Sequence, residues 1–467
     1  MAEGSAGVRI PAGTADYERM RQRHVARFEA LFAGYCDRID WSVEQLRRER
    51  LRLLRALLAE AVKKSLWHRE RLAHVDLREI LESDLEALPV MTKTDMMDNF
   101  DDIVTDRRIT RELCERHLEE LTHDAYLLGE YHVVASGGSS GQRGVFVYGW
   151  HAWAILWASI ARFQHRDWDC DPTLVGVPQV IALVAASKAT HISAATRQTF
   201  STPRNPEHLF PVNQPLEQII DGLNELQPTM LTGYSSFLQR LALEARAGRL
   251  RITPRRVKAI AEPLLPETRA AVEAAWGVPI ANAYGMSEGV FGGFCGHGTH
   301  LPDDLCLVEP VNAAGKGVAR GVPSERLYIT NLYNSVLPLV RFEVTDEITV
   351  LDTACPCGSA MRRIADPQGR LDETFVYGTG VSVHPHVFRS ILGEEPEIIE
   401  YQVHQTERGA RIDVVAESKI DTRRVGRKIE QAIVALGVDQ PEVTIVPVAA
   451  LNRLTTGKLR RFVPLAR

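Results

Sequence analysis

The sequence predicts a large α/β protein that continues into a β-rich section and ends in a small α+β unit. Between residues 132 and 280, short apolar segments alternate with amphipathic ones, which is typical of a sheet covered by helices on both faces. After Glu309, short apolar segments follow one another without helices between them. A polar joint with Gly and Pro, 366–370, then precedes about 100 residues, a length that can fold alone.

Length, composition and charge are those of an ordinary multidomain protein. The chain has 467 residues, of which 45% are hydrophobic and 25% charged, and its formal net charge is −5. These values predict roughly two to four domains and argue against a nucleic-acid or membrane partner. No apolar segment approaches the ~20 residues of a membrane span, and the start lacks a signal-peptide core. Seven scattered cysteines do not indicate a disulfide scaffold. We therefore expect a cytoplasmic protein.

The N-terminal section is predicted to be helical. Residues 1–16 are small and polar and predict a loose arm. From 17 to 64, leucines recur at helical spacing among Arg and Glu, which predicts amphipathic helices. The segment 88–95, LPVMTKTD, predicts a connector broken by proline and then a helix, with Thr94 or Asp95 as its N-cap.

The remaining elements follow from the same patterns. The segment 132–148, HVVASGGSSGQRGVFVY, predicts a strand, a small flexible loop and a second strand. Further strands are predicted at 173–177, 181–184, 229–234, 256–260, 278–280, 325–330, 337–342, 347–351, 400–404, 410–416 and 442–447. Helices are predicted at 150–164, 216–226, 235–247, 266–276, 384–392 and 422–436.

The glycine/serine loop between the first two strands could hold an anion. Its residues are Ser136, Gly137, Gly138, Ser139, Ser140 and Gly141. Without bulky side chains, several backbone N–H groups and hydroxyls can approach one phosphate. The loop is not of the Walker type, which ends in Gly-Lys-Ser/Thr before a helix. By itself it could equally be an exposed turn.

Four later segments combine with this loop. They are NAYGMSE at 282–288, the strand-flanked Asp346 after Arg341, GRLDE at 369–373 and LTTGK at 454–458. A strand end followed by a glycine turn, as at 282–288, is where open α/β sheets place ligands. Each segment alone has an ordinary explanation: a loop, a joint, or a solvated surface lysine.

Together, in this order, the five segments resemble those of the adenylate-forming superfamily, which includes acyl-CoA synthetases, free-standing adenylation domains and luciferases. The chain is most similar to the phenylacetate–CoA ligase branch, through LPVMTKTD at 88–95, Glu262-Pro263-Leu264 followed by PETR, and ACPCG at 354–358. The resemblance runs from about residue 45 to the end. It implies an N-terminal adenylation domain, 1–369, that binds ATP and an acid, and a small mobile C-terminal domain, 370–467, that carries the catalytic lysine.

The resemblance also assigns roles. The family joins a carboxylate to the α-phosphate of ATP, expels pyrophosphate, and then moves the acyl group to a thiol. Ser287 would contact the α-phosphate, and Glu288 would carry Mg²⁺, which prefers oxygen ligands. Lys458 would meet the negative charge that develops on the phosphate and carboxylate oxygens. We expect these three residues to be catalytic.

Other positions are implied to bind the nucleotide or the acid. The residues from Ser136 to Gly141 would hold the β- and γ-phosphates. Tyr284 would stack on adenine, with the segment 261–263 (Ala, Glu262 and Pro263) behind it, and Asp346 would accept the ribose hydroxyls. Arg370 would be a further nucleotide ligand, and Asp372 would be the hinge of the mobile domain. The acid pocket is expected at Tyr234, Ala283 and Gly285.

Some positions depart from the family pattern. The loop ends in GQRG at 141–144 rather than Gly-x-Pro followed by Lys or Thr, and Ala261 replaces a glycine. Glu343 and Thr345 stand where the branch often has arginines. These changes leave adenylation as the expected chemistry, and they leave the acid and the acceptor open.

A metal site is predicted from cysteine and histidine. Cys355 and Cys357 form a tight C-x-C turn, and Cys295 and His300 precede them. Thiolates plus imidazole suit Zn²⁺, and four protein ligands would mark a structural site. The branch has a similar arrangement. His297 and Cys306 are rival ligands, and buried free thiols are the alternative.

The leading functional hypothesis is an ATP-dependent ligase that joins a small, aromatic carboxylic acid to coenzyme A, with Mg²⁺ as cofactor. A second hypothesis keeps the adenylation but transfers the acyl group to an amine or to a thiol of a separate carrier protein. A third is a non-catalytic ligand-binding protein on an adenylation fold. The sequence leaves the oligomeric state open, with a homodimer among the options.

Overall fold

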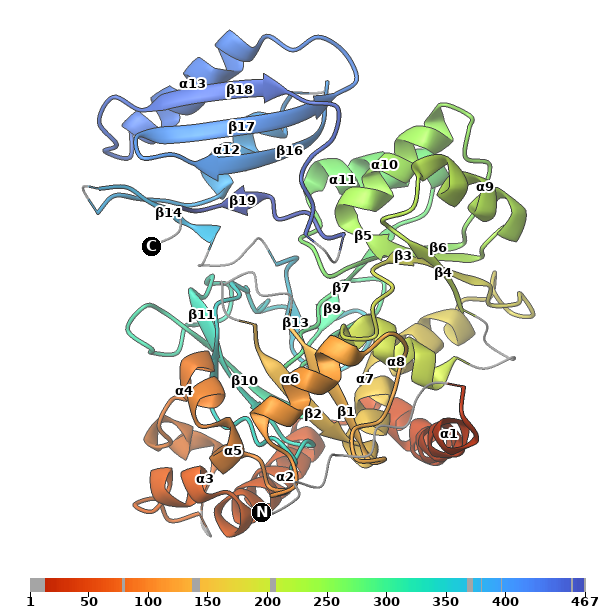
Figure 1. Ribbon diagram of the computed structural model, residues 1–467, viewed down its shortest axis with the longest axis vertical. Helices are drawn as coiled ribbons and strands as arrows, with labels where there is room; N and C mark the ends of the chain where they lie inside the picture. The colour runs from red at the N-terminus through yellow and green to blue at the C-terminus, as the bar shows by residue number, and fades with distance from the viewer. Residues whose placement is uncertain are drawn as a thin grey trace.

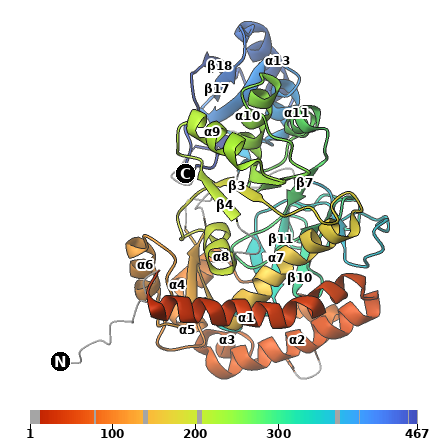
Figure 2. The same cartoon turned by 90° about the vertical axis from the view of Figure 1, so that its right-hand side faces the viewer.

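Long helices form one end of the molecule, as Figure 2 shows for α1 and α2. The computed structural model describes residues 13–77, 80–136, 143–201, 207–367, 373–378, 380–395, 397–454 and 457–465. Helix α1 (Ala15–Asp37) packs along α7 (Trp150–Cys170), and α2 (Val43–Lys64) begins at a capping box of Ser42 and Gln45. The amphipathic helices predicted over 17–64 are confirmed. Short helices follow: η1 (Arg38–Asp40), α3 (Leu66–Arg71), η2 (Glu82–Ala87), α4 (Lys93–Asp98), α5 (Phe100–Ile103) and α6 (Arg111–Glu120).

The N-cap predicted for α4 is wrong by two to three residues. Thr92 is the cap: its hydroxyl accepts the N–H of Asp95 at 3.0 Å. The Asp95 carboxylate in turn accepts the N–H of Thr92 at 2.8 Å. This reciprocal capping box places Thr94 and Asp95 inside the first helical turn, where Asp95 serves as the N3 partner.

The glycine/serine loop lies between two paired strands, as predicted. β1 (Tyr131–Ala135) and β2 (Val145–Gly149) are antiparallel, with Ala135 opposite Val145. The Ser136 hydroxyl accepts the N–H of Gly144 at 2.8 Å and closes the stem of the loop. Residues 137–142 lie outside the described part of the chain. Helix α7 starts directly after β2 and extends six residues beyond its predicted end.

A five-stranded parallel sheet carries the α/β part of the fold (Figure 1). Its order is β4 (Glu207–Pro211), β3 (Ile181–Ala185), β5 (Met230–Tyr234), β6 (Arg256–Ile260) and β7 (Ile280–Ala283). Strands alternate with α8 (Ile192–Phe200), α9 (Leu216–Leu226), α10 (Ser235–Arg246) and α11 (Pro266–Trp276). The predicted α/β class is therefore confirmed. Its core joins β3, β5 and β6 to the apolar faces of α9 and α10.

Two predicted strands of this region are corrected. Residues 173–177 form turns, because the Asp171 carboxylate accepts the N–H of Thr173 at 2.8 Å and bends the chain. Val175 consequently points into solvent with 73% of its surface exposed. Strand β7 starts at Ile280, where 278–280 was predicted, because its pairing partners in β6 extend from Val257 to Ile260.

The β-rich section contains a three-stranded antiparallel sheet of β10 (Cys306–Val311), β11 (Arg326–Asn331) and β12 (Phe342–Val344). A small sheet joins β8 (Gly293–Phe294), β9 (Thr299–His300) and β13 (Arg363–Ile364). The strand predicted at 325–330 is confirmed. The strand predicted at 337–342 is wrong except at its end, because Arg341 has a φ of +52° and interrupts the extended backbone. Residues 347–351 make only isolated bridges.

The C-terminal unit, blue in Figure 1, has its own sheet and core. Its sheet has the order β18 (Glu442–Pro447), β17 (Gly409–Ala416), β16 (Ile398–Gln405) and β19 (Phe462–Val463). A short hairpin of β14 (Phe375–Val376) and β15 (Ser382–Val383) accompanies α12 (His386–Leu392) and α13 (Thr422–Val434). This α+β architecture was predicted, whereas the predicted boundary at 369/370 lies outside the described residues. Within the described ranges, no helix combines the length and apolarity needed to cross a bilayer.

Candidate active site

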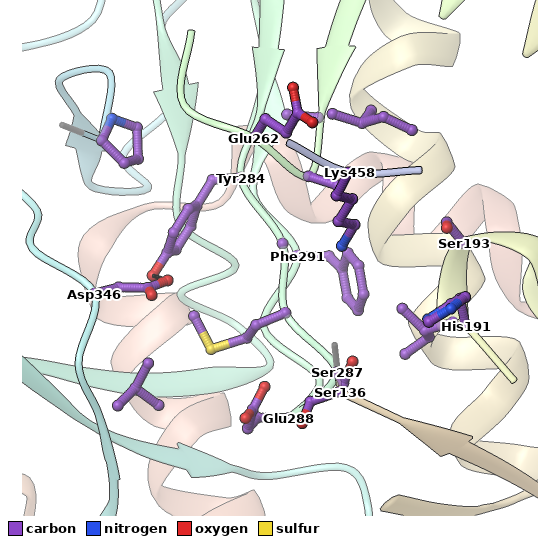
Figure 3. Close-up of a pocket in the computed structure, with 18 of the residues that line it drawn as sticks. Ser136, His191, Ser193, Glu262, Tyr284, Ser287, Glu288, Phe291, Asp346 and Lys458 are labelled. Carbon is purple, nitrogen blue, oxygen red and sulfur yellow. Dashed lines mark hydrogen bonds between the residues drawn. The ribbon is translucent and has the colours of Figure 1, made fainter. Parts of the chain in front are cut away.

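One cavity of about 650 Å³ lies where segments far apart in the sequence meet (Figure 3). Lys458 of the C-terminal unit points into it on one side, while Ser136, Ser287 and Glu288 lie together on the opposite side. Most of the predicted site residues with described positions line it: Ser136, Glu262, Pro263, Ala283, Tyr284, Gly285, Ser287, Glu288, Asp346 and Lys458. Gly137 to Gly141, Arg370 and Asp372 lie outside the described residues.

The turn that carries Ser287 and Glu288 is held by side chains from two sheets. Tyr148 donates its hydroxyl to the carbonyl of Ser287 at 2.6 Å, and Asn331 donates its amide to the carbonyl of Glu288 at 3.0 Å. Gly289 closes the turn with a φ of +101°, and a Cβ there would lie 2.1 Å from Asn331 Nδ2. Only glycine fits this position. The turn therefore presents a hydroxyl and a carboxylate on a fixed backbone.

Tyr284 and Asp346 form a buried pair on another wall of the cavity. The Tyr284 hydroxyl donates to Asp346 Oδ2 at 3.1 Å. Tyr284 follows β7 and Asp346 follows β12, so the pair joins the parallel sheet to the β-rich section. The exposed fractions are 7% for Tyr284 and 6% for Asp346. An aromatic face next to a carboxylate suits a base and a sugar with vicinal hydroxyls.

The C-terminal segment enters the site at Lys458. Gly457, with a φ of +75°, packs so closely that a Cβ would lie 1.9 Å from Val212 Cγ2. This fit explains a glycine directly before the lysine. Lys458 Nζ lies 5.9 Å from the ring centroid of Tyr234, within the range of a cation–π contact.

Tyr234 itself does not line the cavity, contrary to the prediction for the acid pocket. Its side chain is buried, and its hydroxyl accepts the N–H of Ala186 at 3.0 Å. Burial raises the pKa of Tyr234 to about 12. Tyr234 is therefore uncharged, and its ring contacts the ammonium group of Lys458. Ala283 and Gly285 do line the cavity, as predicted.

The sequence identified Lys458 but not His191, nor the further positive charges of Arg143 and Lys188 near it. His191 lines the cavity beside Lys458 in Figure 3. Burial, and then the charges of Lys458, Arg143 and Lys188, lower the pKa of His191 to about 4. The imidazole is thus neutral, while the lysines and Arg143 supply cationic surroundings for an anion. Arg143, noted in the sequence only as a departure from the family pattern, is one of these cations.

A second group that the sequence missed lies on α7, α8 and β6. Trp157, Ile160, Ile192, Thr196, Arg197 and Lys258 line this part of the cavity. The apolar members make it suitable for an organic side chain. A lysine in the middle of the strand 256–260 was the one available signal, because charged residues are uncommon at such positions of a central strand.

The predicted metal ligands converge. The ligand atoms of Cys295, His300, Cys355 and Cys357 all lie within 4.8 Å of one another. His300 Nε2 is 3.2 Å from Cys295 Sγ and 3.4 Å from Cys357 Sγ, and the two sulfurs of Cys295 and Cys355 are 3.5 Å apart. Sulfur ligands of tetrahedral zinc are separated by about 3.8 Å, so the donor set fits this ion.

The surroundings of the cluster also suit a metal. His300 Nδ1 is hydrogen-bonded to the carbonyl of Met361 at 2.8 Å, which leaves Nε2 directed toward the sulfurs. The rival ligand Cys306 is buried elsewhere and donates to the carbonyl of Gly289. Neither Cys306 nor His297 belongs to the cluster within the described part of the chain.

The sequence matches one curated relative over part of its length. A phenylacetate–coenzyme A ligase from Aromatoleum evansii is 25% identical over 223 residues, which are 44% of this chain and 49% of that protein. The match thus spans about half the length of this relative. No protein-family model matches the sequence.

Solved structures match over nearly the whole chain. A 2-hydroxyisobutyryl-CoA ligase in the postadenylation state, in complex with R3-HIB-AMP, has a TM-score of 0.69 at 17% identity, covering 97% of this chain and 94% of that one. The same ligase in the thioesterification state, in complex with 2-HIB-AMP and CoA, has a TM-score of 0.57 at 18% identity, with 91% of each chain covered. The chain has the fold of the adenylate-forming superfamily and resembles its phenylacetate–CoA ligase branch in sequence, as its ordered segments predicted.

Proposed function

We propose that this protein uses ATP to activate a carboxylic acid as its acyl-adenylate and then transfers the acyl group to coenzyme A. The observation that carries the proposal is the convergence of Ser287, Glu288, Asp346 and Lys458 on one cavity, although they come from distant parts of the chain. The curated relative is a phenylacetate–CoA ligase, and the structural neighbour is a CoA ligase with an acyl-AMP. Both support an AMP-forming acid–thiol ligase.

The nucleotide would lie along the wall that carries Tyr284 and Asp346. Tyr284 would stack on the base, with Glu262 and Pro263 behind it, and Asp346 would accept the ribose hydroxyls. The phosphates would then reach Ser136 and the turn at Ser287. Glu288 would hold Mg²⁺ there, and the bound ion would offset phosphate charge. Loop residues Gly137 to Gly141 and Arg370 remain proposed ligands.

The acid would enter the part of the cavity formed by α7, α8 and β6. Its carboxylate would meet the α-phosphate near Lys458, because Lys458 is the cation that points into the cavity beside His191. A positive charge at that place stabilises the charge that develops as the two anions join, which is worth roughly 3–4 kcal/mol in comparable sites. Trp157, Ile160 and Phe291 on the cavity walls support an aromatic acid.

The second half-reaction would require movement of the C-terminal unit. We propose two domains, 1–369 and 370–467, with the hinge at Asp372. Rotation would remove Lys458 and open the site to the thiol of coenzyme A. Coenzyme A is favoured over an amine or a carrier protein because both relatives named above are CoA ligases.

The Cys295, His300, Cys355 and Cys357 cluster is proposed as a structural zinc site. Four protein ligands fill a tetrahedral coordination sphere, so the ion would not take part in the chemistry. It would join the small sheet of β8, β9 and β13 to the turn at 355–358.

ATP–pyrophosphate exchange across a panel of aromatic and aliphatic acids tests the proposal. We expect exchange with at least one acid, and formation of its acyl-CoA when coenzyme A is added. Exchange without acyl-CoA would favour an amine or carrier thiol as acceptor. Absence of exchange with every acid would contradict the proposed activity and favour a ligand-binding protein.

A further inference from the structure

We infer that the acid pocket selects a carboxylic acid with a second anionic group at its far end, and that Lys258 recognises this group. The inference rests on the proposed function, since it concerns the acid that the ligase would activate. It makes Lys258 a specificity-determining residue of the cavity. The sequence alone did not assign any role to this lysine.

Lys258 lines the part of the cavity formed by α7, α8 and β6, where the acid is proposed to bind. It is on β6 two residues before Ile260, so both side chains point to the same face of the sheet, and both line the cavity. Lys258 Nζ is 3.4 Å from Gln164 Oε1 on α7. Gln164 is one turn beyond Ile160, which also lines the cavity.

Helix α8 gives the separation between the two ends of the pocket. At the start of α8, the positive charge of Lys458 helps to lower the pKa of His191. Near the other end of α8, the positive charge of Arg197 lowers the pKa of Lys258. Arg197 follows His191 by six residues, which corresponds to about 9 Å along the helix axis. An acid with its reacting carboxylate at Lys458 would thus reach Lys258 if it were about as long as a ring with two substituents.

The acidic groups near Lys258 are already paired with arginines. Glu207 forms an ion pair with Arg197. Arg256 binds Asp167 at 2.6 Å and Asp171 at 2.5 Å. The one polar contact of the Lys258 ammonium group within the described part of the chain is Gln164, which is neutral. Glu207 and Asp167 still favour the ammonium form of Lys258 from a distance, but no ion pair joins Lys258 to a carboxylate among the described residues.

The charges that line the cavity are unevenly distributed: Lys93, Lys458 and Arg460 accompany its carboxylates, whereas no described carboxylate of α7, α8 or β6 lines it. Its carboxylates all belong to the segments that carry the nucleotide motifs: Glu262, Glu288, Glu343, Asp346 and Glu373. On α7, α8 and β6 the lining charges are Arg197 and Lys258. Burial, and then Arg197, lower the pKa of Lys258 to about 8, while Glu207 and Asp167 act in the opposite direction, so its ammonium form still predominates at neutral pH. A bound anion would offset the cost of this partly desolvated charge.

The test uses pairs of acids that differ only at the far end, such as 4-methylbenzoate and terephthalate (benzene-1,4-dicarboxylate), with 4-hydroxybenzoate as a neutral acceptor. Binding of each acid is measured by titration calorimetry in the wild type, Lys258→Met and Lys258→Arg. Lys63→Met, on the exposed face of α2, is the matched control. Acid-dependent AMP release is measured in parallel.

We expect the wild type to bind the diacid at least tenfold more tightly than the methyl acid. Lys258→Met should abolish or reverse this preference for the diacid. Lys258→Arg should retain the preference, and Lys63→Met should leave it unchanged. Preference for the methyl acid, preference for the neutral hydroxyl acid, or a ratio that Lys258→Met does not change would overturn the inference. The binding ratio tests it even if no acid releases AMP, an outcome that would contradict the proposed function instead.

Discussion

Glu262 and Leu459 connect the two parts of the molecule through one hydrogen bond. Glu262 Oε1 accepts the backbone N–H of Leu459, the residue after Lys458, at 2.8 Å. Glu262 Oε2 accepts the N–H of Ser236, in the first turn of α10, at 2.9 Å. The carboxylate thus fixes the segment with Lys458 to a helix of the larger part. From the family pattern, Glu262 had been expected only to lie against the adenine, on the side away from Tyr284.

The first prediction concerns this contact. Glu262→Ala should lower the rate of ATP–pyrophosphate exchange at least tenfold, because hydrogen bonds to a carboxylate contribute about 1.5–3 kcal/mol each. Glu262→Gln should have a smaller effect, since its amide oxygen can still accept one of the two bonds. Glu244→Ala, which removes a surface ion pair with Arg249 on α10, is the control. Equal exchange rates in Glu262→Ala and the control would contradict the role of this contact.

The second prediction separates the two half-reactions. Lys458→Ala should reduce pyrophosphate exchange by a factor of about 10²–10³, in line with the loss of one preorganised cation. Acyl transfer to coenzyme A from chemically prepared adenylate should remain near the wild-type rate, because the lysine would have left the site by then. A similar fall in both rates would be incompatible with domain movement.

The third prediction concerns the cysteine–histidine cluster. Protein purified without chelator should contain one zinc ion per chain, measured by metal analysis. Cys355→Ser should lose the ion and lower the melting temperature, whereas Cys36→Ser, a half-buried cysteine of α1, should retain it. Folded wild-type protein without zinc would refute the proposed site.

The fourth prediction concerns pH and His68, which is buried on α3. Its Nε2 donates to the carbonyl of Pro338 at 2.9 Å, and burial lowers its pKa to about 4. Since the unfolded chain binds a proton near pH 6.5, the native state loses stability as the pH falls from about 6.5 toward 4. The contribution of His68 is about 3 kcal/mol over this range.

This prediction is measured by urea unfolding at pH 7.5 and pH 4.5. His68→Gln should reduce the difference between the two unfolding free energies, because its neutral amide can replace Nε2 as a donor. His123→Gln, at an exposed position, should leave the difference as in the wild type. An unchanged pH dependence in His68→Gln would show that His68 is not the group that titrates.

Local sequence signals predicted much of the fold. The bounds of α9 and α11 were correct because proline, glycine and apolar periodicity mark them within the segment itself. The strand predicted at 337–342 failed for a non-local reason. Arg341 adopts its positive φ while its side chain binds Glu309 at 3.0 Å and the carbonyl of Leu88 at 2.8 Å. Neither partner is near it in the sequence.

The parts of the candidate site that carry a sequence motif were predicted. The parts that form only when distant segments pack together were not. The segment 282–288 and Lys458 were found because, in order with the other segments, they resemble the motifs of the adenylate-forming superfamily. The acid pocket was not found, because α8 carries no motif. The place of Lys258 in the pocket is evident only in the folded chain, where it lies next to Gln164. Tyr234 was misplaced for the same reason: its position below Lys458 depends on the C-terminal segment.

The central claim is that one nucleotide binds across Tyr284, Asp346 and Lys458, and a crystal structure of the protein with ATP tests it most directly. We expect difference density for adenine against the Tyr284 ring, ribose hydroxyls hydrogen-bonded to Asp346, and phosphates between Ser287 and Lys458. A nucleotide bound elsewhere on the protein, with this cavity occupied by solvent, would contradict the account.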